Sequence, residues 1–300
     1  MEQRTCHALV LQAQIIHYVF IRVGTITVIG RDKSGVVAKV THCLFVQGAN
    51  ILALEEQVTR GQFSMTLQAS WPASRWNPKW IQADLKDLAN ALGMEIKVNF
   101  NPSHGRQRMA LFASLEPHAP EGLLEAVAKR TLKADPVVMI SNHKSLQKIA
   151  RKHQVPFRHV DWSQRQQAEK KTLEWMESYQ VDFIVLARFM KILSPTFVWH
   201  FKNRIINIHP SLLPSFPGPN AYRQAYEHGV KVAGVTAHFV NMHLDEGPII
   251  AQESFAITPK MTLKDVVAAG QAKETKALVR AVRLFLTKRL DVHWGTVKEV

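Results

Sequence analysis

Cysteine is scarce in this chain of 300 residues, which contains only Cys6 and Cys43. Neither cysteine belongs to a Cys-x-x-Cys pair or to a histidine spacing that would suggest a zinc site. Two isolated cysteines also provide no disulfide framework, and they fit a reducing compartment. We therefore expect a cytoplasmic protein that holds no metal.

Long apolar runs are also missing, since no stretch approaches the roughly 18 uninterrupted apolar residues of a membrane helix. The most apolar N-terminal segment is residues 8–23, and polar side chains interrupt it at Gln12, Gln14, His17 and Arg22. It has neither the charged start nor the small-residue cleavage pattern of a secretory signal. We expect no membrane partner and interpret residues 1–22 as an N-terminal extension. A short organellar presequence, or a start codon upstream of the true one, is the alternative interpretation.

Acidic residues are fewer than basic ones, 24 against 38, which gives a formal charge of +14. The basic residues are scattered, apart from small groups such as Arg151-Lys152 and Lys170-Lys171, so they form no stripe of the kind that binds nucleic acid. We expect solvated helix faces and attraction of an anionic small substrate, with no nucleic-acid partner. A hydrophobic content of 46% excludes disorder, and the length favours two domains over one.

Residues 23–100 show strands and helices in the order βαββαβ, which is typical of a ferredoxin-like domain. The expected strands are 23–30, 51–59, 62–70 and 94–100, and the expected helices are 36–47 and 78–92. Residues 101–108 carry proline, glycine and charge without periodicity, so they are expected to form a linker. Residues 109–300 then form the second domain.

The first domain resembles an ACT domain, because Asp32, Ser34 and Gly35 match the Asp-x-x-Gly turn before its first helix. In ACT domains this turn often contributes to an amino-acid effector site between paired domains. The resemblance therefore implies an effector site at Asp32, Ser34, Gly35 and Asn50, with methionine or glycine as the effector, in a homo-oligomer. A glycine that serves only the geometry of the turn is the simpler interpretation of Gly35.

The second domain alternates short apolar runs with helical segments, which predicts a Rossmann-like α/β fold with a mostly parallel sheet. The expected strands are 109–113, 137–141, 157–160, 183–187, 205–208, 232–240 and 248–257. The expected helices are 121–132, 164–179 and 263–290. Ligands of such folds bind at the carboxyl ends of the strands, so polar residues there are candidates for a site.

The run Asn207-Ile208-His209-Pro210 lies at the end of one of these strands, and Asp245-Glu246-Gly247 follows downstream. Asn207 and His209 are two residues apart on a strand and therefore point the same way. A carboxamide can stabilise an oxyanion, an imidazole can move a proton, and a carboxylate can act as a base. We expect Asn207, His209 and Asp245 to be catalytic and Gly247 to let the backbone pass close to the ligand. His238 is expected either to line the pocket or to be a satisfied core residue.

Residues 109–290 resemble the formyltransferase fold through the run from Asn207 to Pro214 and through Asp245-x-Gly247. In that family the ligand is 10-formyltetrahydrofolate, and the matching Asn, His and Asp are catalytic. The resemblance implies a folate substrate and no tightly bound cofactor. It also implies a folate-lining segment, formed here by Arg188, Phe189, Met190, Ile192 and Leu193.

An ACT domain ahead of a formyltransferase domain is the arrangement of the formyltetrahydrofolate deformylases, and this resemblance spans residues 23–290. It implies hydrolysis of 10-formyltetrahydrofolate to tetrahydrofolate and formate, which supplies formate for purine synthesis and balances one-carbon pools. The loop at residues 114–122 supports water as the acceptor. A phosphorylated acceptor would be expected to bind to backbone N–H groups of a glycine-rich loop. This loop has two acidic residues, two prolines and a single glycine, so it is poorly suited to bind a phosphate.

Formyl transfer to glycinamide ribonucleotide is the main alternative, since Pro210 stands where deformylases commonly carry a second histidine. Pro217 also replaces a lysine that often precedes the last glycine of the motif. A non-catalytic folate or amino-acid sensor is a further alternative, which the presence of all three polar residues disfavours. Formylation of initiator methionyl-tRNA comes last, because we expect no C-terminal nucleic-acid domain after the last helix.

Overall fold

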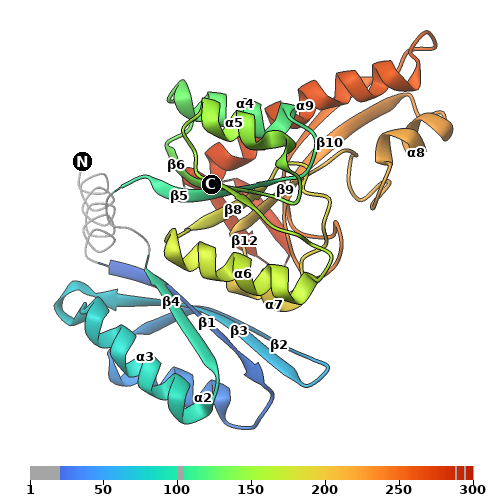
Figure 1. Ribbon diagram of the computed structural model, residues 1–300. Helices are drawn as coiled ribbons and strands as arrows, with labels where there is room; N and C mark the ends of the chain where they lie inside the picture. Colours follow the sequence, from blue (N-terminus) through green and yellow to red (C-terminus); the bar gives the residue numbers. More distant parts are fainter. Residues whose placement is uncertain (1–20, 101–104, 288, 294, 300) are drawn as a thin grey trace, which may run out of the picture. The chain divides into compact units, whose positions relative to one another are not determined.

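The computed structural model describes residues 21–100, 105–287, 289–293 and 295–299 (Figure 1). The chain forms two compact units, residues 1–104 and 105–300. Residues 1–20 of the expected extension lie outside the described residues, and the first strand begins at Ile21. Residues 101–104 of the expected linker also lie outside them, whereas Gln107 and Arg108 already belong to a strand.

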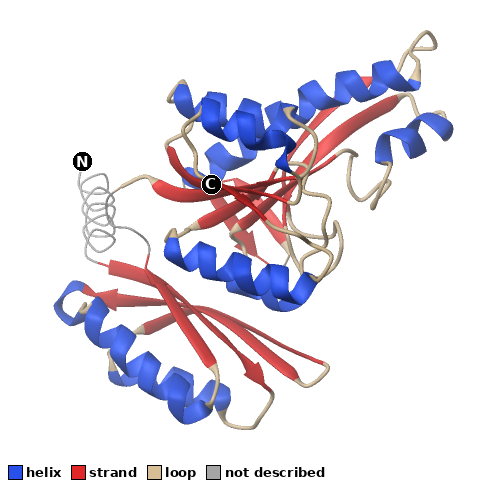
Figure 2. Ribbon diagram, viewed as in Figure 1, coloured by secondary structure: helices blue, strands red, loops and turns tan. Residues whose placement is uncertain are grey.

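The first unit is a four-stranded antiparallel sheet with two helices on one face (Figure 2). Its elements are β1 (Ile21–Arg31), α2 (Val36–Val46), β2 (Asn50–Thr59), β3 (Gln62–Pro72), a 3-10 turn (Ala73–Arg75), α3 (Pro78–Leu92) and β4 (Glu95–Phe100). The strands lie side by side in the order β2-β3-β1-β4. This arrangement confirms the predicted ferredoxin-like class.

Local signals in the sequence determine where the two helices of the first unit begin and end. The side chain of Asn77 accepts a hydrogen bond from the backbone N–H of Trp80, and Pro78 occupies the first turn of α3. Gly93, with a φ of 58°, ends the same helix in the left-handed region. Gly35, with a φ of 82°, precedes α2. The turn predicted as an effector site is therefore also the turn that starts α2.

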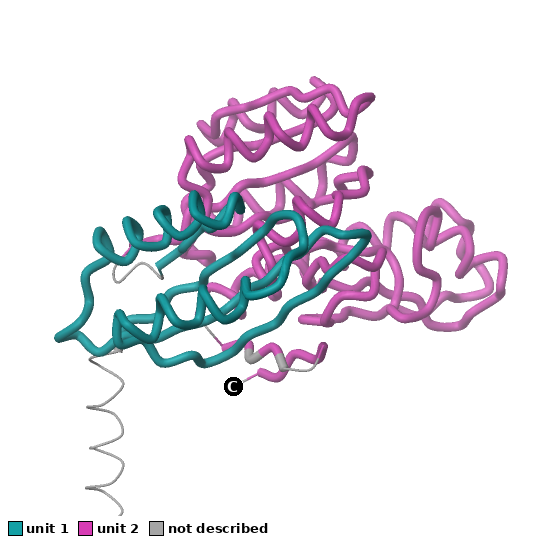
Figure 3. The backbone as a smooth tube through the Cα atoms, turned by 90° about the horizontal axis from the view of Figure 1, so that it is seen from below, with its two compact units in different colours: residues 1–104 teal, residues 105–300 magenta. Residues whose placement is uncertain are grey.

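The second unit, magenta in Figure 3, is built on a seven-stranded sheet in the order β11-β10-β9-β8-β5-β6-β7. Its strands are β5 (Gln107–Ala113), β6 (Ala134–Ser141), β7 (Phe157–His159), β8 (Phe183–Leu186), β9 (Ile205–His209), β10 (Val232–Phe239) and β11 (Ile249–Ala256). The helices are α4 (His118–Ala128), a 3-10 turn (Lys144–Leu146), α5 (Gln147–Lys152), α6 (Arg165–Ser178), α7 (Pro195–His200), α8 (Ala221–Glu227) and α9 (Leu263–Leu286). The strands from β5 to β9 are parallel, and β10 is antiparallel to both of its neighbours. The predicted mostly parallel sheet is confirmed.

Helices cover both faces of this sheet, which is why its strands are apolar on both sides. Met109 and Leu111 of β5 pack with α4, α5 and α9, whereas Ala110 and Phe112 of the same strand pack with α6 and α7. Figure 1 shows the two sets of helices on opposite sides of the strands. The sheet is thereby a rigid support, and its carboxyl edge carries the loops in which polar residues were predicted.

Helix α9 ends earlier than predicted. It begins at a capping box in which Thr262 and Asp265 satisfy each other's backbone N–H groups, and its last residue is Leu286 rather than residue 290. Leu290 instead begins β12 (Leu290–His293), which pairs with β13 (Thr296–Glu299). The alternating side chains of Leu290, Val292 and Val297 pack against the core of the second unit, and this packing favours a strand over a longer helix. In the described part of the chain, every helix is too short or too polar to cross a membrane.

Candidate active site

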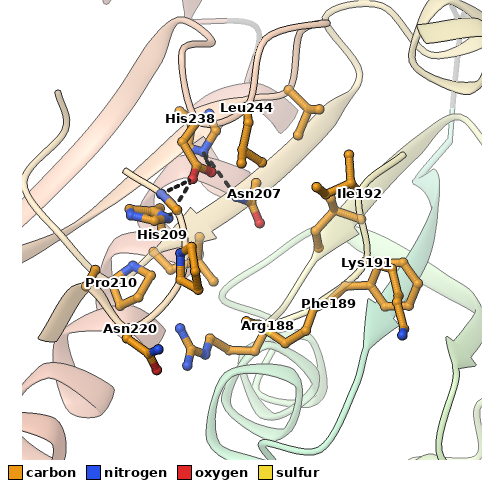
Figure 4. A pocket seen from close by; sticks show the side chains of 18 of the residues that line it. Arg188, Phe189, Lys191, Ile192, Asn207, His209, Pro210, Asn220, His238 and Leu244 are labelled. Carbon is orange, nitrogen blue, oxygen red and sulfur yellow. Dashed lines mark hydrogen bonds and ion pairs between the residues drawn. The ribbon is translucent and has the colours of Figure 1, made fainter. Parts of the chain in front are cut away.

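A cavity of about 550 Å³ lies in the second unit, at the carboxyl ends of β8 and β9 (Figure 4). Its wall is formed by residues 188–193 after β8, by residues 207–210 around the end of β9 and by residues 240–245 after β10. It is completed by Leu186, His238, residues 218–223 leading into α8, the start of α9, and Glu116 after β5. In the sheet, β5 and β8 are neighbours whose connections leave in opposite directions, which is where open α/β folds bind ligands.

Asn207 and His238 are partners across the antiparallel strands β9 and β10, and their side chains meet in the cavity wall. The amide nitrogen Nδ2 of Asn207 lies 3.1 Å from Nε2 of His238, and Nδ1 of His238 lies 2.8 Å from the carbonyl oxygen of Phe239. Burial lowers the pKa of His238, so its imidazole is neutral at neutral pH. Nδ1–H therefore donates to the Phe239 carbonyl, and Nε2 accepts from Asn207. The second N–H of the amide is left for a ligand.

His209 and Asp245 form a buried pair of an imidazole and a carboxylate beside Asn207. Nδ1 of His209 lies 3.3 Å from Oδ2 of Asp245, and only 6% and 7% of the two side chains are exposed. Nε2 of His209 lies 3.0 Å from the carbonyl oxygen of Phe216, which can only accept, so Nε2 carries a hydrogen. The contact with Asp245 is attractive while Nδ1 also carries a proton. The pair therefore shares one transferable proton.

The loop after β10 leaves one oxygen of the Asp245 carboxylate available to a ligand. Oδ2 accepts a hydrogen bond from the backbone N–H of Gly218 at 2.9 Å, in addition to its contact with His209. Oδ1 lies 3.8 Å from Nε2 of His238, which is beyond hydrogen-bond distance. The backbone of Asp245 has a φ of 58°, a conformation uncommon for residues other than glycine. Aspartate tolerates this region better than most residues because its short side chain can form local hydrogen bonds.

The five residues predicted to line a folate site all lie in the cavity wall: Arg188, Phe189, Met190, Ile192 and Leu193. Met190 and Ile192 are 59% and 61% exposed, so they offer apolar surface to a ligand, and Figure 4 shows Ile192 beside the cavity. Phe189 is buried and packs edge-on against Phe112 and Trp162. The buried ring anchors the segment, and the exposed side chains are free to contact a ligand.

Gly247 is not among the residues that line this cavity, and its contact with the ligand stays a prediction. A Cβ atom at Gly247 would lie 1.7 Å from the carbonyl oxygen of Phe239 and 3.3 Å from the backbone nitrogen of Asn241. The glycine is required because the loop crosses the end of β10 at this point, where only a residue without a side chain fits. Its role is to let two segments of the chain approach each other.

A second polar cluster lies beside the cavity, and of its members only Arg188 was predicted as a site residue. Glu274 of α9 is fully buried, accepts a hydrogen bond from the Tyr222 hydroxyl at 2.7 Å and lies 3.0 Å from Nε2 of His118. Nε of Arg188 lies 3.5 Å from the same carboxylate. Burial, together with this carboxylate, raises the pKa of the Tyr222 hydroxyl. The sequence did hold a signal, because Glu274 falls among the buried positions of α9, where a charged residue needs a partner.

The four residues predicted to bind an effector are all exposed in the first unit: Asp32, Ser34, Gly35 and Asn50. The backbone N–H of Asp32 donates to the carbonyl of Gly61 at 2.9 Å. A Cβ atom at Gly35 would meet no atom within 4 Å, but its positive φ is reason enough for a glycine. Asn50 begins β2, and its carbonyl accepts from the Ser70 hydroxyl at 3.5 Å.

Among the described residues, no group of three or more histidine, cysteine, aspartate or glutamate side chains could hold a metal ion. Cys43, the one cysteine within the described ranges, is half-buried in the first unit. Burial and the charge of Asp84 raise the pKa of its thiol, so the thiol is protonated at neutral pH.

Two protein families match the chain. The ACT domain family matches residues 25–99, and the Formyl transferase family matches residues 107–282, which is more than half of the chain.

Individual relatives extend these matches. The formyltetrahydrofolate deformylase of Bacillus subtilis is 36% identical over 275 residues, which are 90% of this chain and 91% of that protein. The crystal structure of a formyltetrahydrofolate deformylase from Pseudomonas syringae pv. tomato has a TM-score of 0.64 at 28% identity, over 96% of this chain and 97% of that one. A glycinamide ribonucleotide transformylase from Symbiobacterium toebii has a TM-score of 0.63 at 33% identity, but its match covers only 67% of this chain and 96% of its own. Since the similarity to the deformylases extends through both units, this chain belongs to the formyltetrahydrofolate deformylases, with an ACT domain followed by a formyl transferase domain.

Proposed function

We propose that Asn207, His209 and Asp245 carry out the reaction of this deformylase, the hydrolysis of 10-formyltetrahydrofolate to tetrahydrofolate and formate. The observation that carries the proposal is the buried pair of Asp245 and His209, 3.3 Å apart, in the wall that also holds the Asn207 amide (Figure 4). A base, a proton donor and an oxyanion donor thus share one wall of a cavity of ordinary ligand size.

The folate binds, in this proposal, against the segment after β8. The exposed side chains of Met190 and Ile192 contact the pterin ring, and backbone groups of the segment form hydrogen bonds to the edge of the ring. The net charge of +14 attracts the anionic glutamate end of the substrate. This arrangement presents the formyl group to the polar residues at the end of β9.

Water attacks the formyl carbon, and Oδ1 of Asp245 takes a proton from it. Negative charge develops on the formyl oxygen, where the second N–H of Asn207 donates to it; one such donor typically accelerates a reaction by about a hundredfold or more. The C–N bond then breaks, and the imidazolium of His209 protonates the departing folate nitrogen. The proton on Asp245 returns to His209 across their 3.3 Å contact, which restores the site.

Formyl transfer to glycinamide ribonucleotide is the second candidate. It is favoured by the 33% identity with the Symbiobacterium toebii transformylase and by Pro210 after the histidine. The loop after β5 argues against it, because this loop places the Glu116 carboxylate in the cavity wall, where it would repel a phosphorylated acceptor. Hydrolysis is therefore the function that the site supports best.

The test is to incubate the purified full chain with 10-formyltetrahydrofolate, with and without glycinamide ribonucleotide, and to measure formate and formylated product. Formate released without any acceptor supports hydrolysis. Product formed only with the ribonucleotide would show a transformylase. Neither product, with folate bound, would show a non-catalytic sensor.

The proposal extends to regulation by a small amino acid, methionine or glycine, at Asp32, Ser34, Gly35 and Asn50. The match of residues 25–99 to the ACT domain family and the exposure of these four residues support it. Formate release is measured while each amino acid is titrated, and Ser34→Ala is compared with the unchanged chain. This variant removes a hydroxyl without disturbing the left-handed turn at Gly35. If no amino acid changes the rate, the first unit has no effector role.

The first unit is also the proposed site of self-association. β2 is an edge strand, and all of its residues except Leu54 are exposed. Ile51, Leu52 and Val58 are 39%, 51% and 49% exposed, and an uncovered apolar edge strand is a template for pairing with a second chain. We therefore propose that the chain forms a homo-oligomer. We also propose that it acts in the cytoplasm and supplies formate for purine synthesis.

A further inference from the structure

Arg188 has a backbone conformation that is unfavourable for any residue with a side chain. Its φ is 62°, in the left-handed region where glycine is unstrained. The backbone N–H of Ser114 donates to the Arg188 carbonyl at 3.2 Å, and the hydroxyl of Ser114 accepts from the N–H of Met190 at 3.0 Å. These bonds hold the strained turn against the loop after β5. Arg60 and Arg130 share this conformation but are exposed, whereas Arg188 lies in the cavity wall, and this combination indicates a function for its side chain.

The side chain of Arg188 is fixed inside the cavity. It extends toward Asn220 (Figure 4), its Nε lies 3.5 Å from Oε2 of Glu274, and 18% of it is exposed. The Glu274 carboxylate is fully buried, between the Tyr222 hydroxyl at 2.7 Å and His118 at 3.0 Å. Removing the cation from a buried carboxylate is costly, so the arginine does not readily swing out of the cavity.

Glu116 and Gln271 complete this group of side chains. Nε2 of Gln271 donates to Oε2 of Glu116 at 3.2 Å, and Nδ1 of His118 lies 3.8 Å from the same carboxylate oxygen. We call the set the Arg188 cluster; it consists of Glu116, His118, Arg188, Tyr222, Gln271 and Glu274. Four of these residues, Glu116, Arg188, Tyr222 and Gln271, line the cavity that Asn207, His209 and Asp245 also line. One part of the cavity wall is thus formed by side chains that contact one another, while Nε of Arg188 and Nδ1 of His118 are buried without a hydrogen-bond partner.

We propose that Arg188 selects water as the acceptor by filling the space that an amine acceptor would occupy. The inference rests on the proposed function, since it concerns the nucleophile in the same reaction. Asn207, His209 and Asp245 do not distinguish between nucleophiles, because water and an amine both attack the formyl carbon and both lose a proton. The choice between them therefore depends on the space beside the formyl group. Arg188 determines specificity without taking part in the bond changes.

The two reactions differ only in the atom that attacks. In hydrolysis the water oxygen bonds to the formyl carbon, the bond from that carbon to the folate nitrogen breaks, and the folate nitrogen receives a proton. With an amine, the amine nitrogen forms the new bond, and the same folate nitrogen receives the proton that the amine loses. The first reaction gives formate and the second a formamide. The ratio of the two products therefore reports which nucleophile reached the carbon.

The experiment compares the full chain with Arg188→Gly, using 10-formyltetrahydrofolate and an excess of glycinamide as the amine probe. Glycine removes the side chain and also relieves the left-handed strain. Formate and N-formylglycinamide are quantified, and a blank without protein is subtracted. We expect the unchanged chain to give formate and the variant to raise the ratio of formamide to formate by about tenfold or more.

The matched control is Arg223→Ala. Arg223 also lines the cavity, but it is exposed and pairs with Glu227 on its own helix at 3.8 Å, so its removal is expected to leave the product ratio unchanged. A ratio that rises equally in this control would overturn the role of Arg188.

A folded Arg188→Gly variant that still gives the product ratio of the unchanged chain would overturn the inference and leave hydrolysis intact. If the lost cation prevents folding, Glu274→Gln is added, because the glutamine oxygen still accepts from the Tyr222 hydroxyl and the side chain carries no charge. The double variant is expected to show the same rise in formamide, and an unchanged ratio there would equally overturn the inference. No formate from the unchanged chain would overturn the proposed function and this inference together.

Discussion

The orientation of the Asn207 amide depends on the protonation of one neighbouring residue. Nε2 of His238 can accept from Asn207 only while the imidazole is neutral. Burial has the largest effect and lowers the pKa of His238, although the Phe239 carbonyl and the Asp245 charge raise it. Protonation of His238 would turn the amide N–H away and remove the oxyanion donor.

We expect stability to fall as the pH drops below about 6.5, the ordinary pKa of histidine, and activity to fall only at a lower pH, where His238 is protonated in the folded chain. The unfolded chain binds a proton at His238 below this pH, whereas the folded chain binds it only at a lower pH. The unfolded state therefore binds more protons in this window, and the free energy of unfolding decreases as the pH falls through it. Urea unfolding and formate release over a pH series provide the measurement. His238→Gln should lose this part of the pH dependence, and an unaltered dependence would assign it to other groups.

Asp245 offers a direct test of the proposed base. Asp245→Asn should lower kcat by about a hundredfold or more while the KM for the folate changes little, because the apolar contacts to the pterin lie on another segment. Formate release at a series of substrate concentrations measures both quantities. Glu246→Gln is the control, since this neighbouring carboxylate is exposed. Undiminished turnover in Asp245→Asn would exclude Asp245 from the mechanism.

At the scale of elements, α9 connects the core of the second unit to the cavity. Its first turns place Leu263, Val267 and Gln271 in the cavity wall, Glu274 contacts Arg188 one turn later, and its second half packs into the core. The capping box at Thr262 determines where this helix begins. Changes at this cap therefore bear on both stability and the cavity wall.

Thr262→Ala should lower the free energy of unfolding by about 1 kcal/mol, because the first backbone N–H groups of α9 lose the oxygen that accepts from them. Thr262→Ser retains that oxygen and should be nearly as stable as the unchanged chain. Chemical denaturation of the three proteins measures the difference. An equal loss in both variants would show that the methyl group, and not the hydroxyl, stabilises the helix start.

At the scale of the whole molecule, each unit has its own hydrophobic core. The proposed role of the first unit is effector binding and self-association, and that of the second unit is hydrolysis. The first unit buries its apolar residues between one face of its sheet and two helices, and leaves β2 as an exposed edge. The second unit covers both faces of its sheet and opens a cavity at the carboxyl edge. The exposed edge strand and the candidate active site therefore belong to different units.

We expect Leu52→Lys to shift the oligomer toward the monomer, because a charge on the edge strand opposes pairing with a second copy. Sedimentation velocity over a range of concentrations measures the shift, and formate release shows whether the second unit is intact. Gln57→Lys places the same charge at a polar position of the same strand and should have the smaller effect. A protein that is monomeric before any substitution would contradict the proposed homo-oligomer.

Much of the architecture was predictable because it depends on local periodicity. Apolar runs predicted the strands of both sheets. Helical spacing and capping residues predicted α3 with the same bounds as those observed. The strand period also placed Asn207 and His209 on one face, and both line the cavity. The end of α9 was predicted wrongly, because packing of Leu290 against the core outweighed the helical pattern.

The sequence by itself therefore determined the two folds and the residue types that meet at one sheet edge, since these follow from the chain's own spacing. Only the tertiary structure decided how the side chains are paired. The register of β9 against β10 brings His238 to Asn207, and the crossing of a loop over β10 explains Gly247. The packing of α9 brings Glu274 to Arg188. Such contacts join segments that are far apart in the chain, and no local period in the sequence encodes the distance between them.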